Sequence, residues 1–452
     1  MSESDNDEGH PSPERWHQHW TIKLMVLGIV IGALAGLVVL LFRMAITEAM
    51  QLFTTGVGFE GLSPPLRLIL PAAGGLAVGL LAHYVFYRDS DVGVSLVLER
   101  IAYAGSRLRL RGALAQFLYG VLAIGSGHSV GREGPSIHMG AAIGSFLGQK
   151  TGADSNHMRI LVAAGAAGAF AGALDIPLAG VVFVLEVILS TYSLMLFAPV
   201  AVATVVASTI TQLNVGEEAL IVIPAAVPHP WWFAPMEVAI GLGAAIISYF
   251  LLRGVEGIHR MGEQTPVPPW ALPAIGGLLV GSMAAFSPGV MGVSYHLLGP
   301  IFSGEVAVAG MAALLVAKLV ATIISLGTQS RGGAVGPALF LGALLGVLTA
   351  ESVRTFTALE PGGNAIYGII GMAAGVAAIL NAPFTATVAA FELVREPDII
   401  PLALLATVSA AVTSRDWFKA QSIFAWTLHL RELSQPSLPE RGQACTVPGN
   451  EV

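Results

Sequence analysis

Five consecutive residues carry the clearest chemistry in the sequence, and they read Gly131-Arg132-Glu133-Gly134-Pro135. Apolar sequence stands close on both sides of them. Pro135 suits the first turn of a helix, where its missing N–H group costs nothing, and the glycines leave neighbouring N–H groups accessible. A helix N-terminus carries about half a positive charge and free N–H donors, so it attracts anions. The segment therefore predicts an anion site without a fixed cation, which suits an ion that must also leave.

Glu133 stands at the mouth of this predicted anion site. While it is ionised, its carboxylate can occupy the site in place of the anion. Once protonated, it loses that attraction and can swing away, so one residue can act both as gate and as proton carrier. The alternative is a solvated turn with an Arg132–Glu133 pair. The apolar flanks argue against that alternative, and a carboxylate inside a membrane indicates function.

The composition places the chain in a lipid bilayer. Of 452 residues, 54% are hydrophobic and 11% are charged, whereas a soluble domain carries about 25% charged residues. The net charge of −7 lies largely in the first 14 residues and does not argue for a nucleic-acid partner. With the lone Cys445 and no metal-ligand spacing of His, Asp or Glu, we expect no disulfide, metal or other cofactor. The sequence also shows no pairing of a nucleophile with a base, so we do not expect an enzyme.

The apolar stretches predict an all-α membrane protein with interrupted helices. The first, from Leu24 to Leu41, is near the length that spans hydrocarbon. Several later stretches are too short, and many are cut by proline, as at Pro135, Pro177 and Pro383. Broken helices at membrane depth are tolerated only where they are buried in protein or line an aqueous cavity. The pattern therefore indicates a transport path.

The chain also repeats itself, with corresponding motifs about 200 positions apart. Such interrupted segments in two halves are the best sequence indication of a transporter site between the halves. The matched motifs are Gly93-Val94-Ser95 with Gly292-Val293-Ser294, the pattern G-P-x4-G-x3-G at Gly134 and at Gly336, and Asp175-Ile176-Pro177 plus Glu186 with Asn381-Ala382-Pro383 plus Glu392. The predicted organisation is a disordered cytoplasmic segment 1–21, a first membrane repeat 22–215, a linker 216–231, a second membrane repeat 232–430 and a short cytoplasmic tail 431–452.

These motifs together resemble the CLC family of chloride channels and proton-coupled chloride antiporters. Residues 131–135 match the family's signature around its gating glutamate, and Gly93-Val94 is similar to the core of its G-S-G-I-P element. Residues 333–337 are similar to its G-x-F-x-P element, with Val335 at the Phe position. The resemblance covers about residues 22–430. Because only a short tail follows Leu430, we expect none of the nucleotide-binding CBS domains that some members carry.

The resemblance implies a fold of about 18 helices per subunit, with two inverted repeats whose broken helices meet at a midplane anion site. It also implies a homodimer in the cell membrane, with one pore per subunit and both termini cytoplasmic. An arginine-rich loop around Arg107 and Arg109 favours the same orientation by the positive-inside rule. The positions it implies around the anion are Gly131, Arg132, Gly134, Ala334, Val335, Val92, Gly93 and Phe424, with Glu133 as the gate.

Two departures from the family pattern concern the central anion. Val92 stands where the family has a coordinating serine, and Phe424 stands where it has a coordinating tyrosine. Both hydroxyl donors are then missing, unless Ser95 or Ser90 supplies one. Backbone N–H groups at Ala334 and Val335 should still donate, because they do not depend on side-chain type.

A third departure concerns proton coupling. The family's glutamate doublet aligns on Glu186-Val187, so Val187 stands at the inner proton-passing position. We therefore favour a passive, voltage- or pH-gated chloride channel over a chloride/proton antiporter, with fluoride or nitrate as alternative anions. An unrelated transporter of organic anions would need more polar side chains at the broken helices.

Other polar residues in the apolar sequence have a simpler interpretation. We expect Asp175, Glu186 and Glu392 to act at helix ends or subunit contacts rather than as proton relays. His128 and His138 flank the gating segment and are expected to be polar lining residues.

Overall fold

A computed structural model gives the protein an all-helical fold, as predicted. It describes residues 13–89, 91–189, 194–215, 233–357 and 363–434. The first half contains α1 (Pro13–Thr54), α2 (Gly58–Gly61), α3 (Pro64–Leu80), the helical turns η1 (Leu81–Val85) and η2 (Tyr87–Asp89), α4 (Val94–Tyr103), α5 (Leu110–Ser126), α6 (Glu133–Lys150), α7 (Ser155–Leu174), α8 (Pro177–Phe183), the π-helical turn η3 (Val184–Ile188) and α9 (Leu194–Val215).

The second half has a similar order of helices. It contains α10 (Ala234–Gln264), η5 (Pro269–Ala271), α11 (Leu272–Ala284), η6 (Pro288–Val290), η7 (Tyr295–Leu297), α12 (Leu298–Phe302), α13 (Val308–Gly327), α14 (Val335–Thr357), α15 (Asn364–Leu380), α16 (Pro383–Val394), α17 (Ile399–Val412), η8 (Thr413–Trp417) and α18 (Ile423–Ser434). The predicted linker 216–231 lies outside the described residues.

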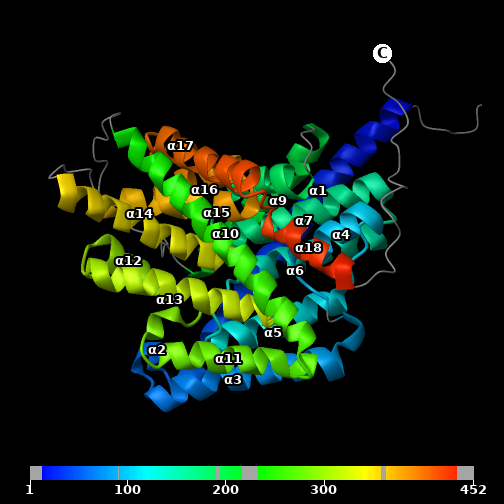
Figure 1. Cartoon of the computed structure of the whole chain (residues 1–452). Coiled ribbons are helices and arrows are strands. Elements are labelled where there is room, and N and C mark those ends of the chain that lie inside the picture. The colour runs from blue at the N-terminus through cyan, green and yellow to red at the C-terminus, as the bar shows by residue number, and fades with distance from the viewer. Residues whose placement is uncertain (1–12, 90, 190–193, 216–232, 358–362, 435–452) are drawn as a thin grey trace, which may run out of the picture.

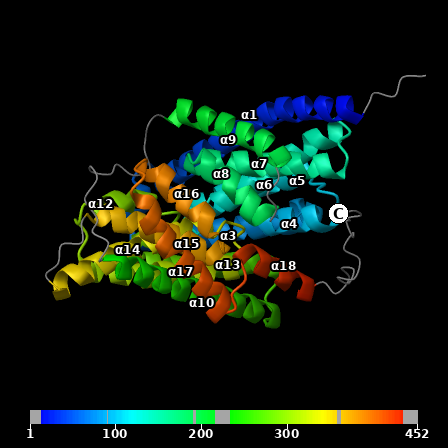
Figure 2. The same ribbon diagram turned by 90° about the horizontal axis from the view of Figure 1, so that it is seen from above.

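The two halves lie against each other along several helices. α3 and α11 run side by side at one edge of the molecule (Figure 1). From above, α1, α7 and α9 lie on one side, and α10, α14 and α17 lie on the other (Figure 2). The short helices α8 and α16 pack against each other between these groups. α18 returns to the first half and packs on α4 (Figure 1).

The repeated glycines predicted from the sequence are positions of close helix packing. A Cβ atom at Gly140 of α6 would lie 2.1 Å from the carbonyl oxygen of Gly165 on α7, and one at Gly342 of α14 would lie 2.1 Å from that of Gly371 on α15. Each half thus brings two helix backbones into direct contact at its signature helix. Small residues permit such close approach in membrane bundles.

The lengths of the helices agree with a multi-pass membrane protein containing broken helices. In the described part of the chain, eight helical segments are long and apolar enough to cross a bilayer. Five further apolar helices are shorter, and they are Leu110–Ser126, Pro177–Ile188, Pro269–Ala284, Asn364–Leu380 and Pro383–Val394. Short apolar helices of this kind were predicted at Pro177 and Pro383.

Helices extend into both predicted terminal segments. Residues 13–21 form the start of α1, and residues 431–434 continue α18. Pro13 stands in the first turn of α1, where proline is favoured, and no further proline or glycine interrupts the sequence before Lys23. The helix therefore extends beyond its apolar part. Residues 1–12 and 435–452 lie outside the described residues.

Candidate anion site between the two halves

The two signature segments meet in the middle of the molecule through their backbones. Gly131 donates its N–H to the carbonyl oxygen of Gly333 at 2.7 Å, and Gly333 donates to that of Gly131 at 2.8 Å. α6 begins two residues after Gly131, and α14 begins two residues after Gly333. The start of one helix therefore faces the start of the other, in agreement with the fold that the family resemblance implies. Their free N–H groups lie close together at this seam.

Glycine lets the two backbones approach closely at this seam. A Cβ atom at Gly131 would lie 2.8 Å from the backbone nitrogen of Gly336, so a side chain there would push the two helix starts apart. A Cβ atom at Gly134 would lie 3.1 Å from the Cα of Gly333, which is a tight contact. The glycines that were predicted to expose N–H groups thus also let the two backbones touch.

The carboxylate of Glu133 is fully buried at this seam. A Cβ atom at Gly336 would lie 2.9 Å from its Oε2, so this oxygen lies over the first turn of α14 in the other half. The other oxygen, Oε1, accepts a hydrogen bond of 2.8 Å from the Tyr295 hydroxyl. Oε2 has no hydrogen-bond partner among the described residues. The acid therefore occupies a place where an anion would be attracted.

Tyr295 is a contact of the gate position that sequence reasoning missed. It begins η7 and directly follows Ser294, the last residue of the repeated Gly292-Val293-Ser294 motif. The guanidinium of Arg132 lies 5.7 Å from the centre of the Tyr295 ring. The repeat could have drawn attention to this position, because the corresponding residue after Ser95 is the apolar Leu96.

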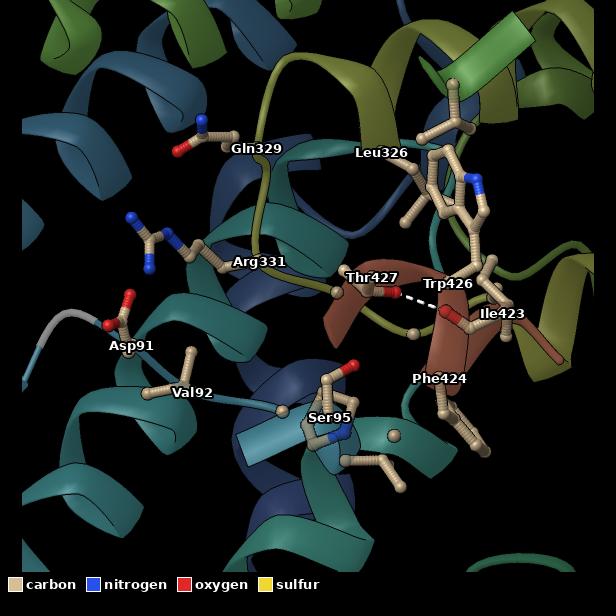
Figure 3. Close-up of a pocket in the computed structure, with 18 of the residues that line it drawn as sticks. Asp91, Val92, Ser95, Leu326, Gln329, Arg331, Ile423, Phe424, Trp426 and Thr427 are labelled. Atoms are coloured by element: carbon tan, nitrogen blue, oxygen red, sulfur yellow. Dashed lines mark hydrogen bonds between the residues drawn. The ribbon is translucent and has the colours of Figure 1, made fainter. Parts of the chain in front are cut away.

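A cavity of about 320 Å³ leads to the seam from the side of α4 and α18. Gly134, Pro135, Gly333 and Ala334 line it, so both signature helices begin at its wall. Its other lining side chains come from α4, α5, α10, α13, α18 and the loops before α4 and α14 (Figure 3). Glu133 is the neighbour of Gly134 but does not line the cavity. Val335 begins α14 and is fully buried.

Val92, Gly93 and Phe424 line the same cavity, although Phe424 lies more than 300 positions after the other two in the chain. Val92 and Phe424 present apolar side chains to it (Figure 3). The Ser95 hydroxyl points into the space between α4 and α18 (Figure 3). Ser95 therefore remains a hydroxyl donor within reach of this cavity, whereas Ser90 lies outside the described residues.

Glu186 and Glu392 hold the two halves together at another pair of helix ends. Glu392 accepts the N–H groups of Leu178 and Ala179 at the start of α8, both at 2.7 Å. In return, Glu186 accepts the N–H groups of Phe384 and Thr385 at the start of α16, at 3.2 and 2.7 Å. The Thr385 hydroxyl adds a third donor to Glu186 at 2.6 Å. Both acids are helix-end groups, as expected. Val187 follows Glu186 in η3 and is half-buried.

The remaining polar residues predicted from the sequence have structural contacts. Asp175 ends α7 with a positive φ of 62° and accepts a hydrogen bond from Gln212 at 2.6 Å. His128 bonds the carbonyl oxygen of Pro71, and His138 bonds that of Gly93. His138 therefore orients the loop that lines the cavity and does not line it itself. Among the described residues, no three His, Cys, Asp or Glu side chains are grouped closely enough to hold a metal.

The family model for voltage-gated chloride channels matches residues 74–415. The chain belongs to the CLC family. It is 31% identical over 355 residues to a ClcB-like chloride channel protein of Ralstonia nicotianae, covering 77% of this chain and 82% of the relative. It is 30% identical over 404 residues to the voltage-gated ClC-type chloride channel ClcB of Escherichia coli, covering 86% of this chain and 95% of the relative.

Solved structures share this CLC fold. A slow cyanobacterial Cl⁻/H⁺ antiporter superposes with a TM-score of 0.82 at 22% identity, covering 91% of this chain and 99% of the other. A CLC-type fluoride/proton antiporter superposes with a TM-score of 0.76 at 21% identity, covering 92% and 99%. The chain is thus a multi-pass CLC protein of anion transport.

Proposed function

We propose that this CLC protein moves chloride through the seam between its halves, and that Glu133 gates the path. The observation that carries the proposal is the fully buried Glu133 carboxylate over the start of α14. An ionised carboxylate there competes with chloride for the same N–H donors and helix dipoles. Protonation removes that competition, so anion flux rises as the pH falls.

The cavity supplies the rest of the path in this proposal. The N–H groups of Ala334 and Val335, at the start of α14, and those of Gly134 and Gly93 provide the polar contacts to the ion. Gly131 uses its own N–H on Gly333 and so holds the seam together. Arg132 adds positive charge near the seam. Val92 and Phe424 shape the cavity with apolar side chains. The path therefore relies on backbone dipoles, which attract an anion without holding it as tightly as a fixed cation.

Within this proposal we favour passive chloride conduction over exchange for protons. Val187 supports it, because its side chain carries no proton at the position where antiporters of the family have their inner acid. The second candidate, chloride/proton antiport, is supported by the antiporter names of the structural neighbours. Fluoride is the alternative anion, since one of those neighbours exchanges fluoride.

The reversal potential of the purified protein in a planar bilayer separates the two candidates. Chloride is kept equal on both sides while a tenfold proton gradient is imposed. A passive chloride channel reverses at zero under these conditions. A clear displacement toward the potential of a coupled exchanger would overturn the passive mechanism and leave the gate proposal standing.

The proposal places the cavity mouth at the cytoplasmic face. The exposed Arg109 and Arg111 side chains flank Asp89 just before the cavity loop, and a basic loop of this kind faces the cytoplasm by the positive-inside rule. α18 lines the cavity, which supports a cytoplasmic C-terminal end. We propose that the N-terminus is cytoplasmic as well. We also propose a homodimer with one complete path in each subunit. Cysteine labelling from each side of the membrane tests the orientation, and cross-linking in liposomes tests the dimer.

A further inference from the structure

Tyr295 is the one described side chain that holds the Glu133 carboxylate through a hydrogen bond. It comes from the other half of the molecule, so the contact crosses the seam that the ion must pass. A hydroxyl donor favours the ionised form of a carboxylate over the protonated form. The phenol therefore stabilises the state in which Glu133 occupies the anion site.

The segment that carries Tyr295 is itself fixed by a buried cation. Lys318 of α13 is fully buried, and its ammonium donates to the carbonyl oxygens of Val290 and Gly292 at 3.0 and 2.7 Å. It also donates to the Ser294 hydroxyl at 2.8 Å. All three donors of the ammonium are thereby used on the turn that directly precedes Tyr295. A charge buried at membrane depth is costly, which indicates that this turn must keep its shape.

Ser294 shows that the turn adopts a conformation that needs such support. Its φ of 67° lies in the left-handed region, which a residue with a side chain rarely adopts. Its hydroxyl donates in turn to the carbonyl oxygens of Gly289 and Met291 at 2.7 and 3.1 Å. This left-handed residue sets the direction in which the chain enters η7, and thus where the Tyr295 ring points.

We propose that Tyr295 is a positioning residue that latches ionised Glu133 in the anion site, and that Lys318 holds the turn that carries this latch. The inference rests on the proposed gating role of Glu133. It adds that the Tyr295 hydroxyl sets the pH range in which the gate opens. Opening the gate then requires both protonation of Glu133 and loss of the phenol contact. The latch holds the gate closed until the pH is lower than Glu133 alone would require.

Few other charged groups face Glu133 in the described residues. Arg132 precedes it and lies over the Tyr295 ring, so it also favours the ionised carboxylate. α14 contributes its N-terminus and has no acidic residue in its first turn. Lys318 of α13 bonds the turn rather than the carboxylate. Removing the Tyr295 hydroxyl alone leaves all of these groups in place.

Tyr295→Phe is the direct test, because it removes one oxygen and keeps the ring. We measure chloride efflux from liposomes between pH 4.5 and 7.5 for wild type, Tyr295→Phe and the exposed-phenol control Tyr84→Phe. The pH of half-maximal efflux should rise by about one unit in Tyr295→Phe, which is a tenfold change in the protonation equilibrium. The maximal efflux at low pH and the profile of Tyr84→Phe should match wild type.

Lys318→Met tests the support of the latch. Provided that it purifies as a folded protein, it should shift the profile in the same direction as Tyr295→Phe. The double variant Tyr295→Phe/Lys318→Met should shift it no further than Tyr295→Phe alone, because both changes act through one hydroxyl. A larger shift in the double variant would overturn the role of Lys318.

Glu133→Gln separates the latch from the gate. If Glu133→Gln keeps the wild-type pH dependence, the proposed gate fails. If Glu133→Gln is insensitive to pH while Tyr295→Phe superimposes on wild type, the latch fails and the gate stands. Adding Tyr295→Phe to Glu133→Gln should change nothing, since no ionised carboxylate is left to hold.

Discussion

Two regions of this molecule place a glutamate of one half at a helix start of the other half, and they do so in different ways. At the start of α8, both oxygens of Glu392 accept backbone N–H groups at 2.7 Å. At the start of α14, Glu133 is held by one phenol, and its second oxygen has no hydrogen-bond partner among the described residues. The first acid is a fixed cap, whereas the second is the one we propose to leave its place as a gate. In this proposal, the number of donors distinguishes the structural carboxylate from the gating one.

The largest effect is expected from removing the charge of Glu133. Glu133→Gln mimics the protonated gate, so chloride efflux from liposomes should be high and constant from pH 4.5 to 7.5. Wild-type efflux should fall as the pH rises, because the protonated fraction of a carboxyl group drops about tenfold for each pH unit above its midpoint. At pH 7.5 the variant should exceed wild type by about tenfold or more.

The exposed Glu48→Gln serves as the matched control, because it makes the same chemical change away from the seam. Its efflux should follow wild type at every pH. Identical pH profiles for Glu133→Gln and wild type would remove Glu133 from the mechanism. Glu133 and Glu392 would then no longer differ in role.

The number of hydrogen-bond donors should also decide how tightly the cavity binds chloride. The next largest effect is therefore expected on chloride affinity. Val92 and Phe424 present no hydroxyl there, and a hydrogen bond to a charged group contributes about 1.5–3 kcal/mol. Each 1.4 kcal/mol is about a factor of ten in affinity. Wild type should therefore bind chloride weakly, in the range of about 1 mM or above by calorimetry, while still giving robust flux.

Restoring donors should tighten that binding. Val92→Ser and Phe424→Tyr should each strengthen chloride binding by about tenfold, and the pair should reach about a hundredfold. Ser95 sharpens this test, because its hydroxyl already points into the cavity (Figure 3). Tight wild-type binding that Ser95→Ala abolishes would show that the missing donors have been replaced.

The smallest effect on chloride flux is expected from substituting the two capping acids, Glu186 and Glu392. These substitutions should instead lower the stability of the protein. Glu392→Gln makes the same substitution as Glu133→Gln, but it turns an amide N–H₂ toward one of two backbone N–H groups. Leaving a buried donor without a partner costs about 1–3 kcal/mol. The apparent melting temperature in detergent should fall, while the pH profile of efflux keeps its wild-type shape. Glu186→Gln should behave in the same way, and a change of pH profile in either variant would contradict a purely structural role.

The sequence predicted the parts of this arrangement that repeat in a regular way. Spaced glycines and prolines indicated the broken helices, because these residues are needed wherever backbones touch or helices begin. The repeat indicated a site between the halves, but the pairing of Gly131 with Gly333 was not predicted. The exchange of Glu186 and Glu392 between the halves was not predicted. Each acid was expected at a helix end, but nothing in the spacing says that the capped helix belongs to the opposite half.

Two contacts near the gate were missed for different reasons. Tyr295 lies 162 positions from Glu133, so only the folded chain brings its hydroxyl to the carboxylate. Lys318 left a clear signal, since it is a single charge inside the apolar stretch that forms α13, and such a residue indicates function or buried support. Its partners are carbonyl oxygens, which a sequence pattern cannot identify.

The exchange of acids between the halves also constrains the order in which the protein is made. Leu178 precedes its partner Glu392 by 214 positions, so it is synthesised well before that partner. Gly131 is likewise synthesised before its partner Gly333. Until Glu392 has been synthesised, it cannot accept the N–H groups at the start of α8, and unpaired N–H groups are costly in hydrocarbon. We therefore expect the proposed ion path to be completed late in biogenesis, when the second half docks on the first. Truncated chains that end before α16 should be retained by insertion factors and cleared by membrane proteases.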